Sequence, residues 1–148
     1  MSEVLRPSTV LPSKRTLTKV LTVDGIELVV EVAAPLNPSR GALLMCHPNP
    51  TGGGMMDSHV YKKAANRLPA LADLTIVRFN TRGTSSEQGT STGTYDQTKL
   101  EQHDVEAMLK FCLEELKLEN LWVVGWSFGT ELTLKYARDR RVKGIILL

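Results

Sequence analysis

The sequence predicts an α/β domain whose sheet is mostly parallel and is opened by an antiparallel hairpin. Short, continuous apolar runs recur along the chain, as expected of strands that are covered on both faces. Segments with helical periodicity separate these runs. A strong hairpin-turn pair, Asp24-Gly25, lies near the beginning of the chain. Strands that alternate with helices favour a parallel sheet with right-handed crossovers and helices on both of its sides.

The first expected elements are a lead-in and the hairpin. Residues 1–14 include two prolines and several Ser and Thr, and are expected to form a loose lead-in to a domain at 15–148. Strands are expected at about Leu17–Val23 and Ile26–Ala33, on either side of the turn. Apolar and polar residues alternate in the second strand, so one of its faces should point into the core.

Four later apolar runs predict the parallel strands, at Gly41–Cys46, Leu74–Phe79, Leu121–Val124 and Val142–Leu148. The last run is apolar on both faces and should be covered and paired, yet the sequence ends there. We therefore expect it to be an outer strand, and we expect the C-terminal strands and helices of the fold to be missing. Its exposed edge could support oligomers or make the chain poorly soluble.

Helices are predicted between these strands. One begins at Asp57 or Ser58, since both are good N-cap residues. Another is predicted at Phe128–Arg138. A low-complexity stretch, Gly83–Thr94, predicts a flexible loop. The clearest helix carries apolar residues at three- and four-residue spacing, namely Val105, Met108, Leu109, Cys112, Leu113 and Leu116.

The composition fits one compact domain and argues against several function classes. The 148 residues are 42% hydrophobic, the net charge is +2, and the basic residues are scattered. This argues against a dedicated surface for nucleic acid or for an anionic membrane. No apolar run is long enough to cross a bilayer, and no secretory signal is visible. Cys46 and Cys112 lie in apolar stretches and are interpreted as reduced core thiols, so we expect a cytoplasmic location.

The strongest functional signal is the segment GWSFG at 125–129. It fits G-x-S-x-G, ends an apolar strand and opens a helix, which is the setting of a nucleophile elbow. In such an elbow the turn strains the backbone of the serine and exposes its hydroxyl. Small residues are needed on either side, because strand and helix cross there. Ser127 is therefore the predicted catalytic nucleophile; the alternative is an ordinary Gly-rich turn.

A serine nucleophile also needs an oxyanion hole made of two backbone N–H groups. One is expected from Phe128, at the positive end of its helix. The second is expected from the loop HPNPTGGG at 47–54. Its prolines have no N–H, so Asn49 between them is the predicted donor, with Thr51 as the fallback. A plain turn is the alternative for this loop; a phosphate-binding loop lacks the residues that should follow the glycines.

Three segments together resemble the serine α/β-hydrolases, particularly the small bacterial branch related to dienelactone hydrolases. They are MCHPNPTGGGMMDSHVY, IVRFNTRGTSSEQG and VVGWSFGTEL, in that order. The resemblance covers nearly the whole chain from about Leu17. It implies an α/β-hydrolase fold, esterase-like chemistry on a small-molecule acyl substrate, and no cofactor. Arg82-Gly83 matches a turn of this fold, and its expected role is to shape the loop beside the pocket.

The catalytic order in this family is nucleophile, acid, histidine, and the chain does not supply the last two. Glu131 and Asp139 follow the nucleophile, but neither lies on a loop after a later strand. All three histidines precede it: His47 is expected to shape its loop, and His59 and His103 to lie near helix starts. No two of them have metal-ligand spacing. A base recruited from upstream is the alternative, with the histidine at 47 the first candidate.

The leading hypothesis is a hydrolase of carboxylic esters or related acyl substrates, in which Ser127 attacks the carbonyl and a histidine outside this sequence takes its proton. The 148-residue chain alone is then expected to be nearly inactive. One alternative is a non-catalytic binding or interaction domain on the same scaffold. Another is an acyltransferase or serine peptidase with the same elbow.

Overall fold

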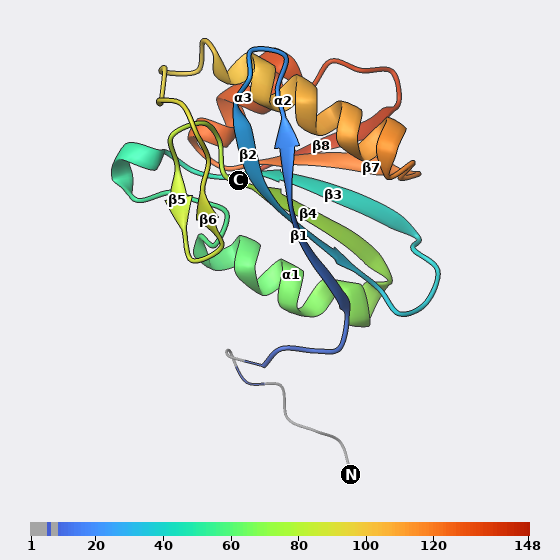
Figure 1. The fold of residues 1–148 in the computed structure, drawn as a ribbon. Coiled ribbons are helices and arrows are strands. Elements are labelled where there is room, and N and C mark those ends of the chain that lie inside the picture. The colour runs from blue at the N-terminus through green and yellow to red at the C-terminus, as the bar shows by residue number, and fades with distance from the viewer. Residues whose placement is uncertain (1–5, 7–8) are drawn as a thin grey trace.

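A six-stranded sheet forms the centre of the molecule, and its strand order is β1-β2-β4-β3-β7-β8 (Figure 1). The computed structural model describes residue 6 and residues 9–148. The first two strands and the β2–β4 pair are antiparallel, and the other pairs are parallel. The predicted sheet, mostly parallel and opened by a hairpin, is thus confirmed. The strands are β1 (Lys14–Leu21), β2 (Glu27–Ala34), β3 (Gly41–Cys46), β4 (Leu74–Phe79), β7 (Leu121–Gly125) and β8 (Val142–Leu147).

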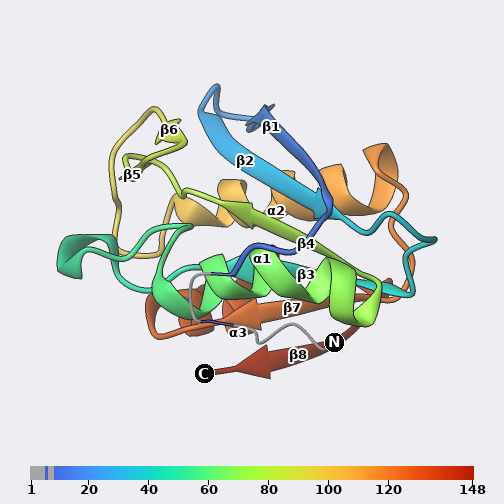
Figure 2. The same cartoon turned by 90° about the horizontal axis from the view of Figure 1, so that it is seen from below.

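The strand ends differ from prediction mainly in the hairpin. Strand β1 ends at Leu21, two residues early, because Thr22 already belongs to the turn. The N–H of Thr22 donates to the carbonyl of Ile26 (2.8 Å), and its hydroxyl accepts from the Ile26 N–H (2.9 Å). Strand β1 begins at Lys14, which is paired with Ala34. At the other edge of the sheet, β8 is the outer strand that the sequence predicts (Figure 2).

Helices cover both faces of the sheet (Figures 1 and 2). On one face lies α1 (His59–Ala72), whose Tyr61 and Ala65 pack against β3, β4 and β7. On the other face lie α2 (Glu101–Lys110) and α3 (Phe128–Tyr136). The predicted amphipathic helix comprises α2 and a short π-helix, η2 (Phe111–Glu115), that continues it.

A buried arginine interrupts the apolar pattern of β4. Arg78 is only 1% exposed and donates to the carboxylate of Asp57 (2.7 Å) and to the carbonyl of Met56 (3.0 Å). It also pairs with Glu31 on β2. Asp57 is thus engaged with the sheet, and Ser58 is the N-cap of α1, although its hydroxyl accepts from the loop and not from the helix.

The segment Gly83–Thr94, predicted as a flexible loop, contains a short hairpin made of β5 (Ser85–Ser86) and β6 (Gly89–Thr90). The buried Ser91 accepts from the N–H of Val29 on β2 (2.9 Å) and donates to the carbonyl of Asn80 (2.7 Å). The Ser and Thr content that indicates a loop here supplies hydroxyls that accept from the N–H groups of Glu27 and Val29 in β2. Composition alone does not reveal this pairing.

The N-terminal lead-in predicted at residues 1–14 is described only in part. Residues 1–5 and 7–8 lie outside the described residues, residues 9–13 have no regular structure, and Lys14 already begins β1. Within the described part of the chain, no helix is both long and apolar enough to span a membrane.

Candidate active site

Ser127 lies in a tight turn between β7 and α3, and its backbone is strained. Its φ is 57° and its ψ is −112°, a region that non-glycine residues rarely adopt. The residue is exposed, and its hydroxyl makes no hydrogen bond with any residue that the structure describes. The predicted sharp turn and unusual backbone are therefore confirmed.

Two glycines make this turn possible. A Cβ on Gly125 would lie 2.5 Å from the carbonyl oxygen of Gly129. A Cβ on Gly129 would lie only 1.9 Å from the carbonyl oxygen of Cys46, the last residue of β3. The N–H of Trp126 also donates to that oxygen (3.3 Å). The elbow is thus pressed against the end of β3, where the loop at 47–54 begins.

This arrangement brings the three predicted site residues to one pocket. Asn49, Ser127 and Phe128 all line a hollow of about 520 Å³. Among the residues that the structure describes, none accepts a hydrogen bond from the N–H of Asn49 or of Phe128. Both residues thus combine a place in the lining of this pocket with an N–H group that has no partner among the described residues. The remaining lining residues are Tyr95, Gln97, Thr98 and Glu131.

The loop after β3 is ordered by its own polar groups. The side chain of Asn49 accepts from the N–H of Thr51 (3.0 Å) and caps a short 3₁₀ turn, η1 (Pro50–Gly52). Since the N–H of Thr51 is already used, it is a poorer oxyanion donor than Asn49. A Cβ on Gly54 would lie 2.1 Å from the carbonyl oxygen of Pro48, so the loop folds tightly onto itself.

His47 is buried and holds the base of this loop. Its Nδ1 lies 2.7 Å from the carbonyl of Pro48, an acceptor, so Nδ1 carries the proton. Its Nε2 accepts from the N–H of Thr81 (3.1 Å). Burial lowers the pKa of His47 to about 4. His47 is therefore a neutral structural residue and is not available as a base for Ser127.

The other two histidines lie on helices. His59 is the exposed first residue of α1, and His103 lies in the first turn of α2, 3.9 Å from Glu106. No histidine of the described chain hydrogen-bonds the hydroxyl of Ser127, as predicted. No three His, Cys, Asp or Glu side chains of the described residues are grouped as metal ligands.

Of the two downstream acids, only one lies at the pocket. Glu131 lines it but forms an ion pair with Lys135 (2.7 Å) one turn further along α3. Asp139 lies past the end of α3 and binds Arg141, whose hydrogen bonds lower the pKa of Asp139 to about 2. Neither acid is bonded to a histidine among the described residues.

Arg82 ties the segment before α2 to the sheet. Its guanidinium donates to Asp104 on α2 (2.8 Å) and to Asp24 in the β1–β2 turn (2.8 Å). These hydrogen bonds hold the pKa of Asp24 well below its usual range. The shaping role that the sequence suggests for Arg82 agrees with these contacts.

Tyr95, Gln97 and Thr98 form a wall of the pocket that no sequence pattern predicts. Both Gln97 and Thr98 have positive φ, 54° and 78°, but neither is a glycine or an asparagine. No residue type therefore indicates the turn.

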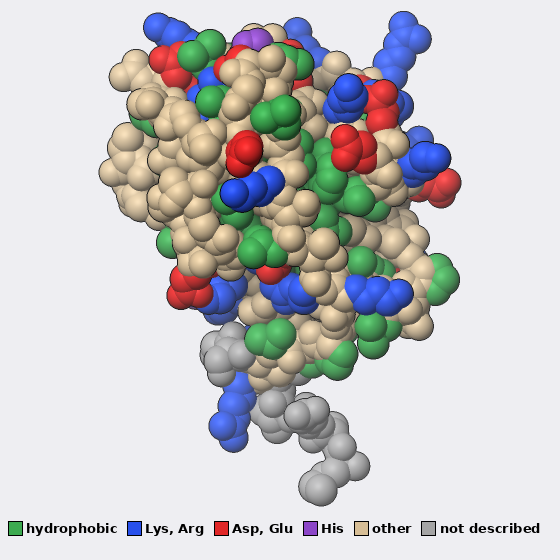
Figure 3. All heavy atoms as spheres, in the orientation of Figure 1, with side chains coloured by type: hydrophobic (Ala, Val, Ile, Leu, Met, Phe, Trp, Pro, Cys, Tyr) green, Lys and Arg blue, Asp and Glu red, His purple; other side chains and the backbone are tan. Residues whose placement is uncertain are grey.

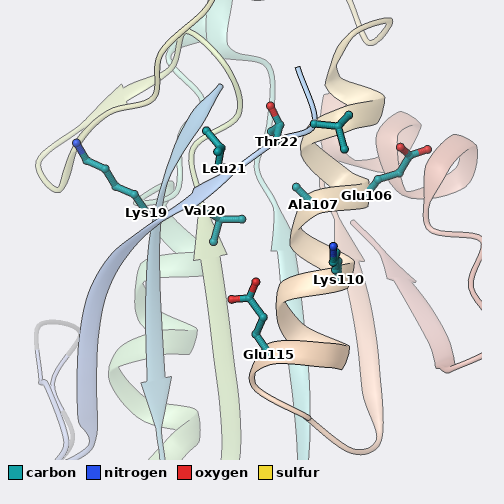
Figure 4. Close-up of a pocket in the computed structure, with 9 residues that line it drawn as sticks. Lys19, Val20, Leu21, Thr22, Glu106, Ala107, Lys110 and Glu115 are labelled. Atoms are coloured by element: carbon teal, nitrogen blue, oxygen red, sulfur yellow. The ribbon is translucent and has the colours of Figure 1, made fainter. Parts of the chain in front are cut away.

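A second hollow, of about 420 Å³, lies between β1 and α2 (Figure 4). Lys19, Glu106, Lys110 and Glu115 contribute charges of both signs to it. None of the predicted site residues lines this hollow, whereas all three line the pocket at Ser127, which is therefore the candidate active site.

Residues 41–148 match the sequence profile of the alpha/beta hydrolase fold family. No curated protein matches the chain. The alpha/beta serine hydrolase XC6422 from Xanthomonas campestris, which has no lid, is 29% identical; its TM-score is 0.77, over 95% of this chain and 63% of its own. An alpha-beta serine hydrolase homologue from Coxiella burnetii is 30% identical, with a TM-score of 0.73 over 89% of this chain and 61% of its own.

The Pyrococcus furiosus esterase Pf2001 shares the fold, with a TM-score of 0.72 at 17% identity over 89% of this chain and 51% of its own. The chain therefore spans less than two thirds of the length of these solved structures. The dienelactone-hydrolase branch is not singled out among them and stays a resemblance. The profile match includes the loop at 47–54 and the elbow and extends over most of the sequence, so the chain belongs to the α/β-hydrolase family.

Proposed function

We propose that the chain carries the nucleophile and oxyanion hole of a hydrolase for carboxylic esters or related acyl substrates. The observation that carries this proposal is the strained, exposed Ser127 beside two unused N–H groups in one pocket. The serine hydrolases of Xanthomonas campestris and Coxiella burnetii, at 29% and 30% identity, support it.

The proposed reaction begins with attack of the Ser127 hydroxyl oxygen on the substrate carbonyl carbon. The N–H groups of Asn49 and Phe128 stabilise the negative charge that develops on the carbonyl oxygen. The ester C–O bond then breaks and leaves an acyl group on Ser127, which water hydrolyses to the acid. The serine proton passes to a base and then to the leaving alcohol. Because His47 is buried and engaged, we propose that this base and its acid partner lie outside the 148 residues.

Hydrolysis of 4-nitrophenyl acetate tests the proposal. The isolated chain should react little faster than its Ser127→Ala variant, because Ser127 has no base to take its proton. The residual rate that the oxyanion hole provides without a base is common to both proteins. A protein that also carries the reading frame beyond Leu148 should show a Ser127-dependent rate on the order of 10³-fold higher or more. A large Ser127-dependent rate from the short chain contradicts the external base. No such rate from the extended protein contradicts the hydrolase itself.

The proposed substrate is a small molecule, and the reaction needs no cofactor, nucleic acid or membrane. Basic and acidic side chains are interspersed on the face shown in Figure 3, which suits a small-molecule enzyme better than a nucleic-acid surface. We place the protein in the cytoplasm, where its free, buried Cys46 and Cys112 would stay reduced.

We also propose that β8 lets the isolated chain associate with itself. Ile145, Ile146 and Leu147 on this outer strand are each at least 40% exposed. An apolar edge strand with unpaired N–H and C=O groups favours edge-to-edge contacts. Size-exclusion chromatography of the chain should show oligomers, and Ile146→Lys should reduce them. A stable monomer with cooperative unfolding would contradict this proposal.

A further inference from the structure

We infer that the turn Gln97–Thr98 is the substrate-selecting wall of the Ser127 pocket, with Gln97 recognising a hydrogen-bonding group of the substrate. The inference rests on the proposed function, because it assigns this pocket to an ester. It names a substrate class, small uncharged esters that carry a hydroxyl or amide group.

The two residues of the turn have backbone conformations that glycine adopts more easily than residues with a side chain. Gln97 and Thr98 have φ values of 54° and 78°, and Thr98 is β-branched, for which a positive φ is an outlier. Such strain persists only where the surroundings enforce it, and it is concentrated at functional sites. The other strained residue of this pocket is Ser127 itself.

Helix α3 enforces the conformation of the turn. The hydroxyl of Tyr136 donates to the carbonyl of Thr98 (2.6 Å), and the ammonium of Lys135 donates to its hydroxyl (3.1 Å). From α2, the fully buried Glu101 accepts from the N–H of Asp96 (2.8 Å). Because α3 begins directly after Ser127, one helix fixes both the nucleophile and this wall.

The groups that the wall presents are polar but carry no net charge. Gln97 is exposed to the pocket, and its amide makes no hydrogen bond with any described residue. An amide offers both donors and an acceptor, so it can bind a hydroxyl or another amide. The negative charge of Glu131 is balanced by Lys135. The lining thus favours a neutral, hydrogen-bonding substrate over an ionic one.

Binding is measured on the Ser127→Ala chain, which keeps the pocket but cannot be acylated. The probes are methyl butyrate and its 2-hydroxy and 3-hydroxy derivatives, titrated by ¹H–¹⁵N NMR. At least one hydroxy ester should bind about 5-fold more tightly than methyl butyrate, the effect of one hydrogen bond. Gln97→Leu should remove this preference. Gln97→Gly, which also relieves the backbone, should do the same, whereas Gln102→Leu on the exposed side of α2 should not.

Tyr136→Phe tests the positioning role of α3. Loss of its bond to Thr98 should reduce the preference for the hydroxy ester at least twofold; a purely structural role would change the Kd of both esters alike and leave their ratio unchanged. Equal binding of all three esters, or a preference that persists in both Gln97 variants, overturns the inference. A Gln97-dependent preference without any Ser127-dependent hydrolysis in the extended protein would instead overturn only the proposed function.

Discussion

The two walls of the Ser127 pocket hold strained residues in different ways. Around Ser127, glycines let the turn pack closely against the end of β3, and a Cβ on Gly129 would lie only 1.9 Å from the carbonyl oxygen of Cys46. In the other wall, Thr98 is held by side-chain hydrogen bonds from Lys135 and Tyr136. A strained turn that depends on close backbone packing can be predicted from the sequence, since only glycine fits at the points of closest approach. A strained turn that is held by side chains from distant parts of the sequence requires no particular residue in the turn itself, so no local pattern predicts it.

The largest effect is expected where the backbone packing is closest. Gly129→Ala should lower the free energy of unfolding by more than about 3 kcal/mol, because neither the strand nor the helix can yield by 1.5 Å or so. Gly52→Ala is the matched control: its Cβ meets nothing within 4 Å, so the change should stay within about 0.5 kcal/mol. Urea unfolding measures both variants. Similar midpoints would show that the elbow is not pressed against β3.

A slightly smaller effect is expected from the pH dependence of the stability that the buried His47 contributes. The pKa of His47 is about 4 in the folded chain and about 6.5 when unfolded. The unfolded state therefore binds the proton more readily. The stability that neutral His47 contributes is fully present above pH 6.5 and is lost as the pH falls through 6.5 towards 4. The total corresponds to about 3 kcal/mol.

Urea unfolding between pH 7.5 and 4 measures this dependence. His47→Gln should flatten the curve, whereas His59→Gln, at an exposed position, should leave its slope unchanged. If the His47 variant keeps the full slope, the loss of stability in acid has another source.

Glycine substitutions that relieve backbone strain should affect the stability of the two walls differently. Ser127→Gly should raise the free energy of unfolding by about 1 kcal/mol, because it removes backbone strain without breaking a bond within the described chain. Ser127→Ala keeps a Cβ and should be near neutral. Thr98→Gly should bring no gain, because it also loses the hydroxyl that bonds Lys135. Thermal unfolding compares the three; an equal gain at both positions would remove the distinction between the walls.

An effect no larger than this is expected from the loss of a single supporting hydroxyl. Tyr136→Phe removes one hydrogen bond to the turn and should cost about 1 kcal/mol. Tyr95→Phe is the matched control, since its hydroxyl has no partner among the described residues. Thr98→Gly keeps the carbonyl that accepts this bond but removes the strained backbone that the bond holds. A double-mutant cycle with Thr98→Gly should therefore show coupling for Tyr136 and none for Tyr95. Additive effects in both cycles would mean that α3 does not hold the turn.

Local sequence patterns were sufficient to predict much of the fold. The runs at Gly41–Cys46 and Leu74–Phe79 predict β3 and β4 with their observed bounds, because strands covered on both faces must be apolar throughout. Arg78 breaks this rule inside β4, and its partners Glu31 and Asp57 are far away in the sequence. The hairpin within 83–94 was missed for a similar reason: its hydroxyls bond β2, which precedes it by about 60 residues.

The sequence by itself determined the sheet class, the elbow at Ser127 and the neighbourhood of Asn49 and Phe128. Each of these follows from residues that are close in the chain or from a steric need for glycine. Only the tertiary structure decided that His47 is buried and neutral and that Gln97 and Thr98 form the other wall. Burial and side-chain hydrogen bonds depend on elements that meet only after folding, so no local pattern encodes them.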